Sequence, residues 1–269
     1  MTEPVLQTHH LVKRFGGITA TDDVSLSIAA GARHALIGPN GAGKTTLINL
    51  LTGVLPATSG QVLLRGQDIS QMAPHRRVGL GLVRTFQINQ LFATLTPLQS
   101  LALAVASRHG AAHRWWRPMG HDKAIAAECE QLLAQFRLTD QADQPTRELA
   151  YGKRRLLEIA LAVAQRPSVL LLDEPAAGVP AAERQDILAT VAALPAEVSV
   201  VLIEHDMDLV FSFATRMTVL VNGAVLTSGT PAEIAADERV KAVYLGESRA
   251  GHGPQAGDAS TTAGAPHGR

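Results

Sequence analysis

The chain has 269 residues, 46% of them hydrophobic, which is enough for one large domain or two modest ones around a real core. It has 24 lysines and arginines against 24 aspartates and glutamates, so its overall charge does not suggest a nucleic-acid partner, although net charge hides local clusters. A single cysteine excludes an internal disulfide and fits a reducing compartment.

The chain shows no targeting or membrane-spanning pattern. Residues 1–10 lack the basic start and apolar stretch of a signal peptide, and no run of about 18 apolar residues occurs. We therefore expect any action at a membrane to go through a partner.

Two regions of strand-like sequence flank a helical one. Residues 97–165 carry apolar residues at helical spacing. The alternation of strands and helices on either side predicts an α/β fold with a parallel sheet and crossover helices. The expected strands are 6–15, 24–28, 35–37, 61–64, 82–86, 169–172, 199–203 and 217–221, and the expected helices are 45–51, 98–106, 124–136, 153–165, 182–194 and 207–214.

This pattern predicts one nucleotide-binding domain over residues 1–247, interrupted by a helical insertion at about 88–165. Residues 248–269 are rich in glycine, alanine, serine and threonine. Such a segment cannot bury enough apolar surface to order itself, so we expect a flexible tail there.

A glycine-rich loop between a strand and a helix predicts a phosphate site. Residues 38–45, Gly-Pro-Asn-Gly-Ala-Gly-Lys-Thr, match the pattern G-x-x-x-x-G-K-[ST]. The glycines let backbone N–H groups approach phosphate oxygens, and the following helix presents its positive end. We expect Lys44 to reach the β- and γ-phosphates and the Thr45 hydroxyl to hold Mg²⁺.

Two carboxylates follow a buried-strand run. Asp173, at the carboxyl end of that strand, is placed to bind Mg²⁺ directly or through water. Glu174 can polarise the water that attacks the γ-phosphate. The sequence lacks the Asn-Lys-x-Asp motif of guanine-selective proteins, which favours ATP.

Residues 149–153, Leu-Ala-Tyr-Gly-Lys, resemble the signature segment of ABC ATPases, usually written Leu-Ser-Gly-Gly-Gln. The predicted helix start offers free N–H groups to phosphate. In that family the segment acts on ATP held by the opposite subunit, so the resemblance implies that a monomer has an incomplete site. It also implies a P-loop NTPase with a RecA-like core, an N-terminal antiparallel β-subdomain and an inserted helical subdomain.

The resemblance assigns further roles by position. Gln87 matches the glutamine at the entry to the helical insertion, His205 matches the switch histidine at the γ-phosphate, and Phe15 matches the aromatic residue that stacks on adenine. The implied catalytic residues are Glu174, His205 and Gln87, and the implied Mg²⁺ residues are Thr45, Gln87 and Asp173. The implied nucleotide contacts are Phe15, Gly38, Pro39, Asn40, Gly41, Ala42, Gly43, Lys44, Thr45 and Thr46, with Ala150, Tyr151 and Gly152 from the signature.

Up to about Gly246 the chain more narrowly resembles the larger ATP-binding subunit of branched-chain amino-acid importers. The similar segments are Phe-Gly-Gly at 15–17, Val-Arg-Thr-Phe-Gln at 83–87, Asp-Glu-Pro-Ala-Ala-Gly at 173–178, Ile-Glu-His-Asp-Met at 203–207 and Tyr-Leu-Gly-Glu at 244–247. The resemblance implies an ATP-hydrolysing subunit at the cytoplasmic face of the inner membrane. Its implied partners are a second, different ATPase subunit, two permease subunits and an extracytoplasmic solute-binding protein.

Three positions depart from the family pattern. The signature serine is Ala150, which removes a hydroxyl contact to the γ-phosphate, and the arginine usual in the following helix is Leu161. The Asp or Asn position after residues 176–179 is Pro180, which offers neither a polar side chain nor an N–H group. Pro180 and Ala150 favour a hetero-pair over a homodimer, and both assemblies stay open.

Several other classes of ATPase share these motifs. A non-transport ABC ATPase would carry long coiled-coil insertions or two cassettes per chain. The ATPase of a lipid exporter would look more like Leu-Ser-Gly-Gly-Glu at the signature. A subunit of a urea or amide importer is a nearer alternative, and urea importers would have histidine at the position of Tyr151. A binding-only subunit is disfavoured by intact Glu174 and His205. The transported molecule is not readable from an ATPase that never contacts it.

Overall fold

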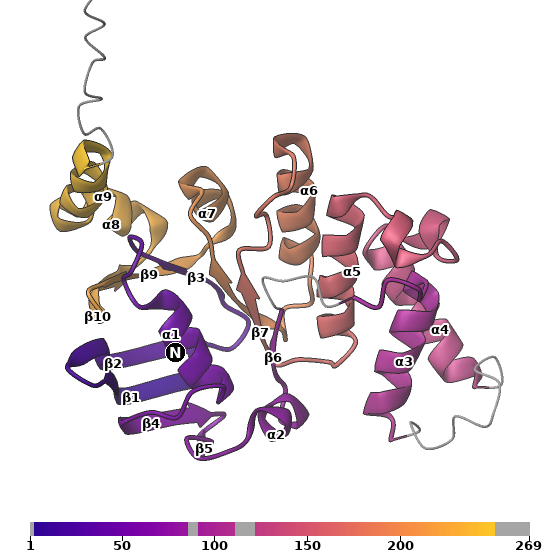
Figure 1. Cartoon of the computed structure of the whole chain (residues 1–269), viewed down its shortest axis with the longest axis horizontal. Helices are drawn as coiled ribbons and strands as arrows, with labels where there is room; N and C mark the ends of the chain where they lie inside the picture. Colours follow the sequence, from indigo (N-terminus) through magenta and orange to yellow (C-terminus); the bar gives the residue numbers. More distant parts are fainter. Residues whose placement is uncertain (1–2, 86–90, 111–121, 251–269) are drawn as a thin grey trace, which may run out of the picture.

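The computed structural model describes residues 3–85, 91–110 and 122–250, with side chains described up to residue 244 (Figure 1). Gln87 therefore lies outside the described residues. Within the described part, no helix combines the length and the apolar character needed to cross a membrane.

The N-terminal region forms a four-stranded antiparallel sheet in the order β2-β1-β4-β5. Phe15 pairs with Ile18 at the hairpin turn, where Gly16 has a φ of 56°. The second strand is longer than expected because its polar first half pairs with β1, although it lacks an apolar pattern. The strands are β1 (Pro4–Phe15), β2 (Ile18–Ala29), β4 (Ser59–Leu64) and β5 (Gln67–Asp68).

A six-stranded sheet in the order β10-β9-β3-β8-β7-β6 forms the centre of the molecule. Five neighbouring strands, β9, β3, β8, β7 and β6, are parallel to one another, and β10 pairs antiparallel with β9 at the edge. All residues of β7 and β8 are buried, as expected for strands covered on both faces. The strands are β3 (Arg33–Ile37), β6 (Leu82–Arg84), β7 (Val169–Asp173), β8 (Ser199–Ile203), β9 (Arg216–Val221) and β10 (Ala224–Gly229).

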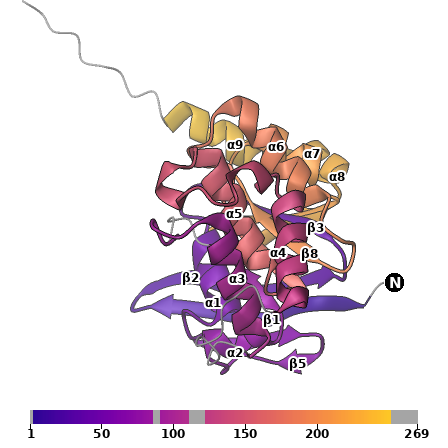
Figure 2. The same ribbon diagram turned by 90° about the vertical axis from the view of Figure 1, so that its right-hand side faces the viewer.

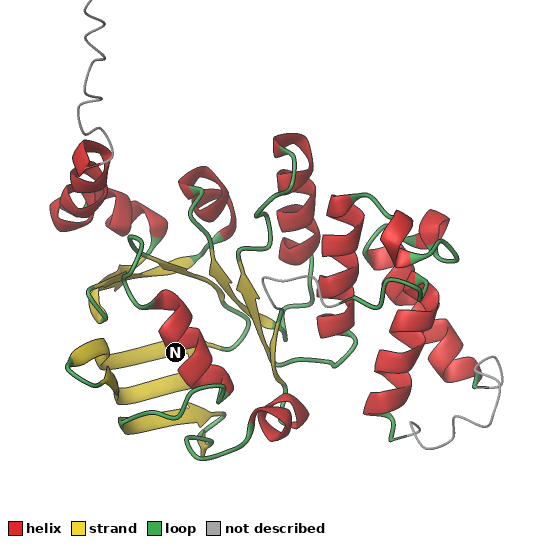
Figure 3. Cartoon of the chain, viewed as in Figure 1, coloured by secondary structure: helices red, strands yellow, loops and turns green. Residues whose placement is uncertain are grey.

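The two faces of the parallel sheet belong to different hydrophobic clusters. Val169 and Leu171 of β7 pack with α1 and the antiparallel sheet, whereas Leu170 and Leu172 pack with the helical subdomain and the helices on the other face. This alternation follows the two-residue period of a strand. Figure 3 shows the strands between α1 on one side and α6 and α7 on the other.

The helical insertion extends to one side of the core sheet in Figure 1, and α3 and α4 lie in front in the turned view of Figure 2. Thr96 caps α3 in a capping box with Gln99, and Asp122 caps α4. The helices are α1 (Lys44–Thr52), α2 (Pro74–Gly79), α3 (Pro97–Arg108), α4 (Lys123–Gln135), α5 (Tyr151–Val163), α6 (Ala181–Ala192), α7 (Met207–Phe213), α8 (Pro231–Ala236) and α9 (Glu238–Ala250), with 3₁₀ turns at Thr139–Gln141 and Thr146–Glu148.

These findings confirm the predicted fold class: a parallel core sheet, an N-terminal antiparallel subdomain and an inserted helical subdomain. One boundary differs from expectation. Helix α9 continues through Ala250, so residues 248–250, expected in the tail, are helical. The helix is anchored by Val240, which is buried in the same cluster as Ile234 of α8.

Candidate nucleotide site

The phosphate loop leaves β3 and enters α1 in the predicted context. Gly43 caps α1 with a φ of 97°, and a Cβ added there would lie 2.5 Å from the Ala20 carbonyl oxygen. Gly38 is even more confined, because a Cβ there would overlap the carbonyl oxygen of Leu220. Glycine is therefore required at both positions by close backbone packing.

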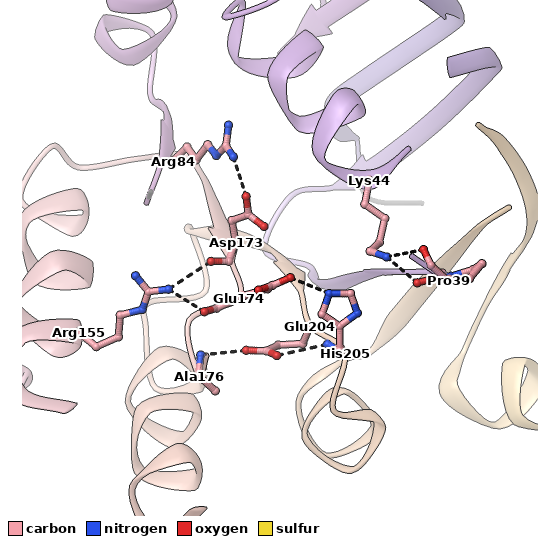
Figure 4. Close-up of polar contacts among 10 residues, drawn as sticks. Pro39, Lys44, Arg84, Arg155, Asp173, Glu174, Ala176, Glu204 and His205 are labelled. Atoms are coloured by element: carbon pink, nitrogen blue, oxygen red, sulfur yellow. Dashed lines mark hydrogen bonds and ion pairs between the residues drawn. The ribbon is translucent and has the colours of Figure 1, made fainter. Parts of the chain in front are cut away.

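Lys44 is folded back onto its own loop. Its Nζ donates to the carbonyl oxygens of Gly38 (2.5 Å) and Pro39 (2.9 Å), and the residue is only 7% exposed (Figure 4). A buried ammonium needs such acceptors to offset its lost hydration. Phosphate oxygens entering the loop would offer the same cation stronger, charged acceptors.

A pocket of about 490 Å³ opens over the loop. This volume lies in the range of small-molecule sites. Most of the predicted loop residues line it, but Gly38 and Pro39 do not. Phe15 does not line it either: this residue is 45% exposed at the end of β1, with Lys13 Nζ 5.0 Å from its ring centroid. The lining residues are Ile18, Thr19, Ala20, Asn40, Gly41, Ala42, Gly43, Lys44, Thr45, Thr46, Glu174, Ile203, His205, Asn222 and Gly223.

Part of this wall was not predicted. Residues 18–20 come from β2, and Asn222 and Gly223 come from the turn between β9 and β10. The carbonyl oxygen of Gly223 accepts from the Asp22 N–H at 2.8 Å, which joins these two walls. Neither segment has a motif of its own, so only the three-dimensional fold identifies them.

Asp173 ends the buried strand β7 and is ion-paired. Its carboxylate lies 2.6 Å from Nη2 of Arg84, whose Nη1 donates to the Asn49 side chain at 2.6 Å (Figure 4). Asp173 is 3% exposed, so the guanidinium offsets the cost of burying its charge. Arg84 links β6, β7 and α1, and it was not among the predicted site residues.

The side chains of Glu174 and His205 are in contact with each other. Nε2 of His205 lies 2.6 Å from Oε1 of Glu174, which is the hydrogen-bond acceptor. Glu174 has a φ of 48°, a left-handed conformation that is costly for a residue with a side chain. Its N–H donates to the Ile203 carbonyl oxygen at 2.9 Å, which holds it there. Both side chains line the pocket.

Arg155 is a second residue that the sequence did not flag. It projects from α5 and is 2% exposed. Its guanidinium donates to the carbonyl oxygens of Glu174 (2.7 Å) and Pro175 (3.0 Å) and to the Glu158 carboxylate (2.6 Å). Burial raises the pKa of Glu158, and the bond from Arg155 opposes that change. Figure 4 shows Arg155 reaching the turn that carries Glu174.

The signature segment does not line this pocket. Ala150 is the N-cap of α5 and makes no side-chain capping bond, as expected when serine is replaced by alanine. Tyr151 donates through its hydroxyl to the Ala177 carbonyl oxygen at 3.1 Å. Ala150, Tyr151 and Gly152 therefore lie outside their own chain's nucleotide pocket.

The other two residues that differ from the family pattern, Pro180 and Leu161, fit their positions in the structure. Pro180 is the N-cap of α6 with a φ of −54°, a value that proline adopts without strain. Leu161 is half-buried against the larger hydrophobic cluster, so an apolar contact replaces the arginine.

The oxygen ligands present suit Mg²⁺ bound together with phosphate. Thr45 lines the pocket and Asp173 ends the neighbouring strand. Among the described residues, no group of three or more His, Cys, Asp or Glu side chains could hold a metal ion. Mg²⁺ commonly takes one or two protein ligands and completes its shell with phosphate oxygens and water. The residues present fit that mode.

The fold, the phosphate loop and the paired carboxylates define a P-loop ATPase of the ATP-binding cassette class. Residues 21–177 match the family model described as "ABC transporter", and the chain belongs to that family. It is an ATP-binding and ATP-hydrolysing subunit of an importer. Residues 224–250 match a second model, "Branched-chain amino acid ATP-binding cassette transporter".

Similar proteins support this placement over nearly the whole chain. The chain is 39% identical to the high-affinity branched-chain amino acid transport ATP-binding protein BraF of Pseudomonas aeruginosa, covering 92% of this chain and 100% of that protein. It is 35% identical to the corresponding protein LivG of Escherichia coli, with the same coverage. A solved structure of an ATP-binding cassette of an ABC transporter in its ADP conformation superposes with a TM-score of 0.80, at 30% identity, over 91% of this chain and 100% of that one.

Proposed function

We propose that this chain powers an importer of branched-chain or related amino acids. The supporting observation is the match of residues 224–250, a segment that spans β10, α8 and α9, to the branched-chain model. The named roles of BraF and LivG agree with it. Tyr151 at the signature argues against the nearest alternative, a urea importer subunit.

The proposed chemistry follows from the pocket. Lys44 exchanges its loop carbonyls for the β- and γ-phosphates, and the loop N–H groups bind the remaining oxygens. Glu174 polarises the attacking water, and His205, 2.6 Å from it, contacts the γ-phosphate. Phe15 stacks on adenine by moving over the edge of the pocket near Ile18, its hairpin partner. We assign Gln87 to the attacking water and to Mg²⁺ by its sequence position alone.

Mg²⁺ would be held by Thr45 and Asp173, with Gln87 as a further ligand. The ion would supply positive charge against the phosphate oxygens. Arg84, which pairs with Asp173 at 2.6 Å, orients that carboxylate at the strand end. This contact prepares the ligand before any metal binds.

The proposed assembly contains a second ABC ATPase subunit and two permease subunits, with a solute-binding protein acting through the permeases. We place the chain at the cytoplasmic face of the membrane, held there by the permeases, and we propose no nucleic-acid partner. Because Ala150, Tyr151 and Gly152 lie outside the chain's own pocket, a second subunit's signature would complete the site.

Reconstitution tests the substrate. The chain, two permease subunits and a second ABC ATPase subunit that assemble with it would be placed in liposomes with ATP on the side of the ATPases. Addition of the solute-binding protein with labelled leucine should give ATP-dependent uptake. Uptake of urea or an amide, with none of leucine, isoleucine or valine, would contradict the proposed substrate class.

A further inference from the structure

Two segments that flank the pocket are joined by side chains with no assigned role. Residues 176–179 follow the turn of Glu174, and residues 204–206 carry His205. Glu204 accepts from the Ala176 N–H at 2.9 Å and from the His205 N–H at 3.3 Å (Figure 4). One carboxylate thereby binds the backbone of both segments.

A second side chain joins the same two segments farther out. Nε of Arg184 donates to the Val179 carbonyl oxygen at 2.8 Å, and its Nη1 lies 3.5 Å from the Asp206 carboxylate. The side chains of this ion pair are 38% and 36% exposed, so solvent weakens it. The inner contact, through Glu204, is buried and is not weakened by solvent in this way.

The buried position of Glu204 is unfavourable for a carboxylate unless its oxygens accept hydrogen bonds. The residue is 6% exposed, and burial raises its pKa. The bonds from the Ala176 and His205 N–H groups act in the opposite direction. An apolar side chain would avoid the cost of burial but would leave those N–H groups without this acceptor.

The position of His205 depends on its backbone. Its side chain is 47% exposed, so packing restrains the ring only in part, yet Nε2 lies 2.6 Å from Glu174. On the other side of that contact, Glu174 is held by Ile203 and by Arg155 through its own backbone. Glu204 adds a further link between the two segments, because it accepts from the N–H groups of Ala176 and His205.

We propose that Glu204 is a positioning residue for ATP hydrolysis, which sets His205 against Glu174 by binding the N–H groups of Ala176 and His205. This inference rests on the proposed roles of Glu174 and His205. It assigns Glu204 no contact with nucleotide, because Glu204 is not among the residues that line the pocket.

The test compares Glu204→Ala with Glu204→Gln in the full chain assembled with its partner subunits. Alanine removes both acceptors, so kcat should fall by about ten- to a hundredfold while KM for ATP stays within about twofold. Glutamine keeps one oxygen for Ala176 but turns an NH₂ group toward the His205 N–H. It should restore part of the rate, leaving kcat about threefold or more below that of the unchanged chain.

The control is Glu128→Gln. Glu128 is also a partly buried carboxylate, held by Arg108 at 2.6 Å and Arg166 at 3.3 Å, but it lies in the helical subdomain. Its variant should keep kcat, even if the melting temperature falls. The proposal is overturned if Glu204→Ala lowers only the melting temperature and keeps kcat per folded molecule. If that variant does not fold, Glu204→Gln decides: an unchanged kcat overturns the proposal.

Glu174→Gln separates this inference from the function on which it rests. An inactive Glu174→Gln beside a fully active Glu204→Ala would overturn the role of Glu204 and leave the catalytic site intact. Normal turnover by Glu174→Gln would overturn the role of the site and this inference with it.

Discussion

Single side chains hold this site together by binding the backbone. Lys44 binds two loop carbonyls, Arg155 binds the carbonyls behind Glu174, and Glu204 binds two N–H groups. In each case a charged group in a buried position is satisfied by peptide dipoles. Arg155 and Glu204 do not line the pocket, whereas Lys44 does, so the segments that carry Glu174 and His205 are held from outside the pocket.

Lys44→Ala tests the phosphate loop. Loss of the ammonium removes a charge-assisted bond to phosphate, so ATP affinity should fall by about ten- to a hundredfold. Titration with labelled ATP measures this. Lys241→Ala is the matched control, because Lys241 is an exposed lysine on α9 that pairs with Glu238 at 2.7 Å, away from the pocket. Equal affinity in both variants would remove residues 38–45 from the nucleotide site.

At the scale of elements, β3 leads directly into the phosphate loop, and it contains a buried histidine. Nε2 of His34 lies 2.9 Å from the Thr218 hydroxyl on β9. Burial, and then the nearby Arg216 cation, lower the pKa of His34 from 6.5 to about 4. Between these values the unfolded chain binds a proton that the folded chain does not. The contribution of His34 to the free energy of unfolding is therefore complete above pH 6.5 and is lost as the pH falls toward 4.

His34→Gln should weaken this acid sensitivity, because glutamine can keep a bond to Thr218 and does not titrate. Urea unfolding at about pH 7 and about pH 4.5 should show that the unchanged chain loses about 2 to 3 kcal/mol more than the variant. An equal loss in both proteins would show that another group governs the acid dependence. Thr227→Gln on β10 is the control, because it changes a half-buried strand residue without adding or removing a titratable group.

The sequence was most informative where elements are long or fully buried. Strands β7 and β8 are continuous apolar runs, and the phosphate loop has a motif that geometry alone explains. The sequence did not predict the short elements β5, α2 and α8, because a few residues are too short a stretch to show a helical or strand periodicity. It also did not predict β10 and α9, because their sequences lack a strong apolar pattern. Arg155 and Glu204 were missed because their partners are backbone atoms brought near only by the fold.

On the scale of the whole molecule, the pocket and the signature segment are separate features of one chain. Pro180 is the N-cap of α6 and Ala150 is the N-cap of α5, and neither makes a side-chain capping bond. We expect both residues to weaken the surface that, in our proposal, completes the opposite subunit's site. We therefore expect the chain to pair poorly with itself and well with a different ATPase subunit.

Light scattering in the presence of ATP tests this asymmetry. Glu174→Gln should trap an ATP-bound complex when mixed with the partner ATPase, and should stay largely monomeric alone. Pro180→Asp should increase self-pairing if the proline is responsible, because it restores a polar side chain at that position. A stable ATP-dependent homodimer of the chain with Pro180 in place would contradict the expectation.

The most direct test of the central claim is ATP hydrolysis by the assembled transporter with Glu174→Gln in this chain alone, beside Glu130→Gln on the exposed face of α4 as control. Our account predicts that the Glu174 variant keeps its ATP affinity, because the phosphate loop is intact. It also predicts that hydrolysis falls by about a hundredfold or more at this chain's site. Glu130→Gln should hydrolyse ATP normally. Phosphate release by the Glu174 variant at the rate of the control would contradict the account.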